Sequence, residues 1–336
     1  MTHSHGTPAS PHSRTRKLGV LGTFVWDTIW TLADVQAGRA FETWGGVAYS
    51  LAAVAAARPP GWEIVPLARV GADLSDEAHA FMAALPGLSA GPGILTVPEP
   101  NNRVELRYTD AARRGERLMG GVGAWTWDEL EPRIAGLDAL YVNFLSGFEM
   151  ELETAERLRA SFQGPLYCDL HSLFLGCPGK GERQPRKLPE WERWAACFDT
   201  IQLNADELGE IGDPGEPVES RIGRILGAGP GLVLVTLGNQ GASTASRPNF
   251  PADPLAWPAH RGSSSLADPA SIENHPVSPA EGDPTGCGDV WGITCFASLL
   301  AGCTVPAAVS RAQAAALRKL SHRGAIGLYE HLATLA

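Results

Sequence analysis

Short apolar runs bounded by glycine alternate along this chain with longer alanine-rich segments. The apolar runs have the length of buried strands, and the segments between them have the length of helices. Such alternation is typical of strands and helices wound into a mostly parallel sheet, which defines the α/β class. We expect strands at residues 18–26, 63–71, 139–146, 165–170, 200–204 and 231–238.

The alanine-rich segments predict the helices of this fold. A further start signal is Thr304-Val305-Pro306, because proline is common in the first turn of a helix and threonine is a frequent N-cap. It predicts a last pair of helices near the end of the chain. The other helices are expected at 47–57, 76–85, 153–162, 219–229 and 289–301.

Two stretches interrupt the alternation, because polar and apolar residues interchange along them. They cover residues 32–44 and 93–121, and their pattern predicts exposed antiparallel strands. We expect these strands to meet as a small flap, or lid, over the ligand edge of the sheet. Residues 245–282 are rich in Pro, Ser and Asp and predict a long loop. Residues 1–17 predict a disordered tail before a single domain over 18–336.

Composition excludes several classes of partner. The formal net charge of -10 argues against binding to nucleic acid or to an anionic membrane surface, since both require a basic field. No apolar segment approaches the roughly 18 residues that a membrane span requires. The cysteines form no Cys-x-x-Cys pair, so neither a disulfide framework nor a structural zinc site is expected. These features favour a cytoplasmic protein with a small-molecule partner.

The most informative motif is GDPTGCGDVWG at residues 282–292. Closely spaced glycines let several backbone N–H groups point at one spot, and a following helix adds the positive end of its dipole. The motif therefore predicts an anion cradle. It has neither the lysine of a P-loop nor the spacing and preceding strand of a dinucleotide fingerprint. Asp289 would either accept a proton from an attacking hydroxyl or only cap the helix.

The order Asp283-Pro284-Thr285-Gly286-Cys287-Gly288-Asp289 resembles the C-terminal signature of the ribokinase-like, or PfkB, family of sugar and nucleoside kinases. Further segments are similar to that family's motifs in the same order, and they begin at Gly45, Val70, Asn204 and Val235. The resemblance implies a three-layer α/β/α ribokinase-like fold with lid strands from about 32–44 and 93–121. It also implies ATP-dependent phosphorylation of an alcohol group.

The resemblance also implies roles for single residues. Asp289 would be the catalytic base, and the amides of Gly286, Cys287 and Gly288 would hold the charge on the transferred phosphate. Glu207 would act on Mg²⁺ through water, with a monovalent cation as a possible further cofactor. The residues implied to bind ATP and its metal are Asn204, Glu207, Thr236, Gly238, Gly241 and Thr285.

On the acceptor side, Asp27 would hold sugar hydroxyls, since a carboxylate accepts two hydrogen bonds. The chain departs from the family at Ser50 and His171, which puts the ordinary sugar specificity in doubt. The full set implied to bind the acceptor is Asp27, Gly45, Gly46, Ser50, Asp169, His171 and Arg103. Alternatives that stay open are a nucleoside or vitamin-alcohol kinase and a non-catalytic sensor. A homodimer through the lid is also expected.

Overall fold

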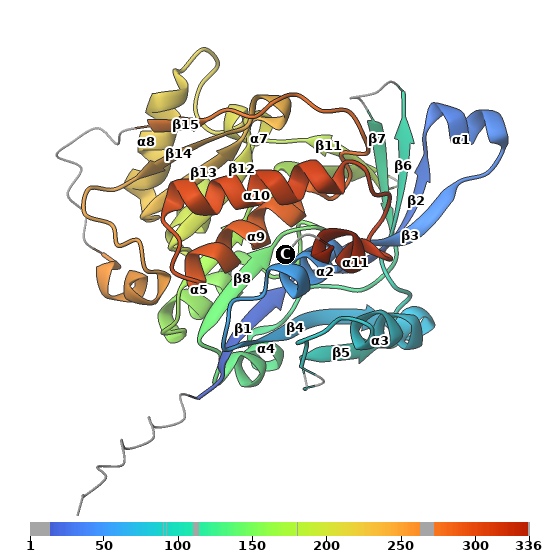
Figure 1. Cartoon of the computed structure of the whole chain (residues 1–336), viewed down its shortest axis with the longest axis horizontal. Helices are drawn as coiled ribbons and strands as arrows, with labels where there is room; N and C mark the ends of the chain where they lie inside the picture. The colour runs from blue at the N-terminus through green and yellow to red at the C-terminus, as the bar shows by residue number, and fades with distance from the viewer. Residues whose placement is uncertain are drawn as a thin grey trace, which may run out of the picture.

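The computed structural model describes residues 14–334 except 90, 92, 110–113, 180 and 263–271. Figure 1 shows a large sheet with helices packed on it and a second, smaller sheet beside it. The expected α/β class with a mostly parallel sheet is therefore confirmed. None of the helices within the described ranges is both long and apolar enough to cross a membrane.

The large sheet is parallel except at one edge, where β14 and β15 run antiparallel to their neighbours. Side chains of successive strand residues point to opposite faces, so the sheet has an apolar core on each side. In the described part of the chain its strands lie in the order β15 (Ile272–His275), β14 (Ala242–Ser246), β13 (Leu232–Thr236), β12 (Thr200–Asn204), β9 (Leu166–Asp169), β8 (Ala139–Asn143), β1 (Arg16–Leu21), β4 (Trp62–Gly71) and β5 (Ile94–Val97).

Helices cover both faces of this sheet and complete the three layers. The face turned to the viewer in Figure 1 carries α2 (Val47–Ala57), α9 (Cys287–Leu300), α10 (Val305–Lys319) and α11 (Leu328–Ala333), and α3 (Ser75–Ala83) belongs to the same core. The opposite core contains α4 (Trp127–Ile134), α5 (Leu152–Ser161), α6 (Trp191–Ala196), α7 (Ala205–Gly209) and α8 (Val218–Ala228). Short 3₁₀ turns are η1 (Ala72–Leu74), η2 (His171–Phe174), η3 (Gly238–Gln240) and η4 (Pro254–His260).

The second sheet packs beside the carboxyl ends of the parallel strands. A small apolar cluster of Val25, Ile29, Val104 and Leu106 covers one of its faces. Its strands among the described residues lie in the order β10 (Leu175–Gly179), β11 (Glu182–Pro185), β7 (Arg114–Met119), β6 (Arg103–Tyr108), β2 (Phe24–Trp30) and β3 (Phe41–Gly46). The hairpin β10–β11 has no counterpart in the sequence-based expectation.

Two expected strands are different in the structure. The single strand expected at 18–26 is split, because the chain leaves the large sheet after Leu21 and β2 joins the second sheet. Within 32–44, residues Leu32–Ala37 form helix α1 instead of a strand. The side chains of Thr31 and Asp34 form a capping box there, and Gly38 ends the helix in the left-handed region with φ of 66°. In Figure 1, α1 lies at the far end of the second sheet.

Other boundaries also need correction. The expected tail ends before residue 17, because β1 begins at Arg16, whose N–H donates to the Gly61 carbonyl at 3.0 Å. The rest of that tail, residues 1–13, lies outside the described residues. Within 93–121, strand β5 pairs with β4 in the large sheet instead of joining the flap. The loop expected at 245–282 contains η4 and β15, and residues 263–271 of it are not described.

Candidate active site

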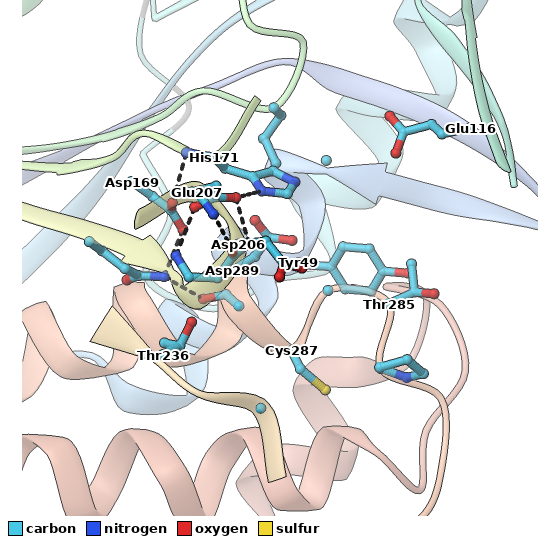
Figure 2. Close-up of a pocket in the computed structure, with 18 of the residues that line it drawn as sticks. Tyr49, Glu116, Asp169, His171, Asp206, Glu207, Thr236, Thr285, Cys287 and Asp289 are labelled. Carbon is cyan, nitrogen blue, oxygen red and sulfur yellow. Dashed lines mark hydrogen bonds and ion pairs between the residues drawn. The ribbon is translucent and has the colours of Figure 1, made fainter. Parts of the chain in front are cut away.

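A cavity of about 530 Å³ lies between the carboxyl edge of the large sheet and the second sheet. The carboxyl ends of β9, β12 and β13 contribute polar residues to it, and β2, β6 and β7 contribute residues from the other side. Ligands of open α/β sheets bind at this edge. Figure 2 shows that the acidic side chains and His171 gather on one side of the cavity, with Glu116 on the other.

Asp289 lies in the first turn of α9 and lines the cavity. Its Oδ1 atom accepts a hydrogen bond of 2.7 Å from Nδ2 of Asn143, a fully buried residue at the end of β8. The N-cap position is occupied by Gly286, and no side chain caps this helix. Asp289 therefore is not the helix cap, and its carboxylate is held at the cavity by another side chain.

The glycine-rich loop turns sharply just before α9. Gly286 has φ of 81°, and a Cβ atom added there would come within 2.5 Å of the Tyr49 ring. Only glycine fits without strain at this position. The N–H of Cys287 donates to the Pro284 carbonyl at 3.1 Å, so this amide, expected to hold phosphate, is engaged within the loop. The first N–H groups of a helix have no partner within it, which leaves the start of α9 suited to an anion.

The Cys287 side chain is not poised for chemistry. Burial is the main cause that raises the pKa of its thiol to about 11. A reactive cysteine has the opposite property, since the thiolate is the nucleophile. The Cys287 side chain therefore packs within the loop and is not suited to act as a nucleophile.

Glu207 organises the acidic side of the cavity. One of its carboxylate oxygens accepts from Nδ1 of His171 at 2.8 Å and from Nδ2 of Asn204 at 2.6 Å, and the other accepts from the Asn204 backbone N–H at 2.8 Å. Asn204 caps the short helix α7 in a capping box with Glu207. Residues 204–207 thus begin helix α7 and also line the cavity.

His171 carries a positive charge in this surrounding. Burial opposes that charge, but the hydrogen bond to Glu207 and the nearby carboxylates outweigh it and raise the pKa of His171 to about 9. Asp169 is buried beside it, and burial, followed by the charge of Glu207, raises the pKa of Asp169 well above its usual range. Asp169 accepts from Nε2 of Gln202 at 2.7 Å, which holds it in place.

Most of the residues implied to bind ATP reach the cavity. Thr236 at the end of β13 lines it, as do Gly238 and Thr285, whereas Gly241 is not among the lining residues. Gly241 has φ of 100°, and a Cβ atom added there would lie 2.1 Å from the His275 carbonyl, so the turn itself requires glycine at this position. The hydroxyl of Thr285 lies 2.7 Å from that of Tyr108 on β6, which connects the loop to the second sheet.

The residues implied to bind the acceptor divide into two groups. Asp27 and Gly46 line the cavity with Asp169 and His171, and Gly45 lies directly against the Asp27 carboxylate. Ser50 is fully buried behind Asn143, 3.4 Å from its Nδ2 atom, and does not line the cavity. Arg103 also lies outside the cavity lining, because its guanidinium pairs with Asp73 at 2.6 Å. Ser50 and Arg103 thus lie outside the cavity lining, and their assignment as acceptor contacts stays a prediction.

Sequence reasoning missed several residues of this site. Asn143 and Gln202 are polar side chains on otherwise buried strands, and that exception to the apolar pattern is the signal that would have found them. Glu116 lines the cavity from β7 and is paired with Arg183 of the unexpected hairpin at 2.9 Å. No local sequence pattern predicts the ion pair of Glu116 and Arg183, because the two residues lie far apart in the sequence.

The cavity offers oxygen ligands of the kind that Mg²⁺ prefers, but not a protein cage for it. In the described ranges no group of three or more His, Cys, Asp or Glu side chains could hold a metal ion directly. The oxygens of Glu207 already accept hydrogen bonds from His171 and Asn204. The residues present can therefore accommodate a hydrated Mg²⁺ held through water, and the role of Glu207 toward it stays a prediction.

Comparison with known proteins supports the fold. No protein-family model matches the sequence, and no curated protein matches it either. Among solved structures, a ribokinase from Thermotoga maritima superposes with a TM-score of 0.68 at 17% identity, covering 95% of this chain and 98% of that one. This chain is thus an α/β/α protein with a cavity at the carboxyl edge of its sheet.

Two further structures agree with the first. A ribokinase from Arabidopsis thaliana, solved with ribose and ATP, gives a TM-score of 0.65 at 16% identity and covers 96% of this chain and 99% of that one. An adenosine kinase from Anopheles gambiae gives a TM-score of 0.68 at 15% identity, and the match covers 94% of this chain and 98% of that one. The chain has the ribokinase-like fold over nearly its whole length, and the expected resemblance in fold is confirmed.

Proposed function

We propose that this protein is an ATP-dependent kinase that phosphorylates an alcohol group of a sugar or sugar-like small molecule, with Asp289 as general base. The observation that carries the proposal is the position of the Asp289 carboxylate. It lies in the first turn of α9, next to the glycine loop, and it faces the cavity. A base and an anion cradle at one point are what attack by a hydroxyl on phosphate requires.

The acceptor side of the cavity suits a polyhydroxylated molecule. Asp27 and Glu116 line it from the second sheet, and Asp169 lines it from the large sheet. Carboxylates bind vicinal hydroxyls well, because each accepts more than one hydrogen bond. Val104 and Leu106 add apolar surface on which the carbon face of a ring can pack.

The donor side is proposed to bind ATP along Asn204, Thr236 and Gly238, with its terminal phosphate at the loop of Gly286 and Gly288. One solved ribokinase-like structure holds ribose and ATP, which supports this donor, whereas another is that of a pyrophosphate-dependent kinase, so the assay below compares both donors. Mg²⁺ would be held through water by Glu207 and would neutralise part of the phosphate charge. The imidazolium of His171 adds a further positive charge at this wall of the cavity.

In the proposed reaction the acceptor oxygen forms a bond to the γ-phosphorus while the bond from that phosphorus to the β–γ bridging oxygen breaks. The proton of the acceptor hydroxyl passes to Asp289, and ADP leaves. Asn143 holds the Asp289 carboxylate by its hydrogen bond, so that the accepting oxygen is fixed before the substrate arrives. Closure of the second sheet over the bound substrates would exclude water from the reacting phosphate.

The test is an assay of ADP formation with ATP and Mg²⁺ over a panel of sugars, sugar alcohols and nucleosides, repeated with pyrophosphate as donor. Formation of a phosphorylated sugar with ATP is the expected result. Turnover confined to nucleosides would favour the nucleoside-kinase alternative, and turnover with pyrophosphate alone would replace ATP as the donor. Ligand binding without any turnover would favour a sensor.

A further inference from the structure

Lys319 is a buried lysine that the proposed reaction does not use. It is the last residue of α10 and its side chain is fully buried. Its ammonium donates to the Asp283 carbonyl at 3.1 Å and to the His322 carbonyl at 2.8 Å, and it lies 3.3 Å from Oδ2 of Asp283. An ammonium is costly to bury, and here oxygen atoms from two separate loops surround it.

One of these loops leads directly into the anion cradle. Asp283 accepts a hydrogen bond from the Thr285 N–H at 3.0 Å, and its own N–H donates to the Leu320 carbonyl at 2.9 Å. Gly282 packs so closely on this carbonyl that a Cβ atom would lie 2.1 Å from it. The loop before Gly286 is therefore fastened to the end of α10, with Lys319 at the junction.

Tyr49 extends the arrangement to Gly286. The Lys319 ammonium lies 5.6 Å from the centre of the Tyr49 ring, a distance at which cation and ring attract. The same ring packs against Gly286. Lys319 thus contacts the start of the glycine loop through Asp283 and its turn through Tyr49.

We infer that Lys319 is a positioning residue for phosphoryl transfer, whose ammonium serves as a tethered cation beneath the anion cradle. It fixes the loop of residues 283–286 and adds a permanent positive charge on the protein side of that loop. Because this charge is part of the chain, the reaction needs no added monovalent cation. The inference rests on the proposed kinase function.

The test uses two variants of the full-length enzyme. Lys319→Met keeps most of the side-chain volume and removes the charge, whereas Lys319→Ala leaves a space lined by the Asp283 and His322 oxygens. Lys187→Met is the matched control, because Lys187 is exposed and its ammonium donates to the Gly212 carbonyl at 3.4 Å. Steady-state kcat and KM are measured in sodium, potassium and tetramethylammonium buffers, and folding is followed by thermal melting.

Wild-type kcat is expected to be the same in all three buffers. Lys319→Met should lower kcat by about 10- to 1,000-fold with little change in the acceptor KM, comparable to the loss of a group that stabilises developing charge. Added ammonium or methylammonium should restore at least about a tenth of the wild-type kcat to Lys319→Ala but not to Lys319→Met. A role in stability alone would give no such recovery.

Wild-type kcat in either folded variant would overturn the inference, and so would a folded Lys319→Ala that small amines do not restore. If neither variant folds, the rates of the wild-type enzyme in the three buffers test the inference. Equal rates would support the role of Lys319 as a tethered cation, and a strict need for potassium would overturn that role. A wild-type enzyme inactive with every acceptor and donor would instead reject the proposed function.

Discussion

A carboxylate acts well as a base when its neighbours fix the oxygen that accepts the proton. Asn143 does this for Asp289 through a hydrogen bond of 2.7 Å. In Asn143→Ala, kcat should fall by about one to two orders of magnitude, because hydrogen bonds to charged groups contribute roughly 1.5–3 kcal/mol. Steady-state kcat of a correctly folded variant tests this effect, and an unchanged kcat would contradict it.

The raised pKa of His171 predicts how the stability of the folded protein depends on pH. Its pKa is raised from 6.5 to about 9 in the folded protein, so its contribution to stability is complete below about pH 6.5 and is lost as pH rises through 9. The free energy of unfolding of the wild type should therefore fall over this window relative to that of His171→Gln. Urea unfolding at pH 6, 7.5 and 9.5 measures the difference between the two proteins. A constant difference across the window would be inconsistent with a charged His171.

At the scale of elements, two nearby glycines at the start of α9 differ in whether a side chain would fit. Gly286 has φ of 81° and packs on Tyr49, whereas a Cβ atom at Gly288 would meet no other atom within 4 Å. Gly286→Ala should lower the free energy of unfolding by at least about 1–2 kcal/mol, the cost of a left-handed residue with a side chain. Gly288→Ala should not destabilise the fold, because alanine favours helix. Equal denaturation midpoints for the two variants would contradict the geometry of the loop.

The sequence predicted the elements that local pattern determines. Helix α9 is an apolar segment that directly follows a glycine loop, and β12 and β13 are buried runs of strand length, so their positions agree closely with expectation. Helix α1 was missed because its apolar residues are exposed, which removes the usual signal of one buried face. A capping box at Thr31 and Asp34 marks its start instead.

At the scale of the whole molecule, the site depends on how two sheets meet, and local pattern does not encode this. Asp27 lines the cavity, although its strand β2 belongs to the second sheet and not to the large sheet expected from the sequence. Arg103 does not line the cavity, because its side chain leaves β6 toward Asp73. Glu116 and Arg183 were missed because their pairing joins β7 to a hairpin far along the chain.

The most direct test of the account is the turnover of Asp289→Asn. Asparagine keeps the shape of the side chain but cannot accept the proton, so kcat should fall by about 10²- to 10⁴-fold while the melting temperature and ATP binding stay near those of the wild type. Asp128→Asn is the control, since Asp128 is an exposed acid in the first turn of α4. Undiminished turnover in a folded Asp289→Asn would contradict the role of Asp289 as the base.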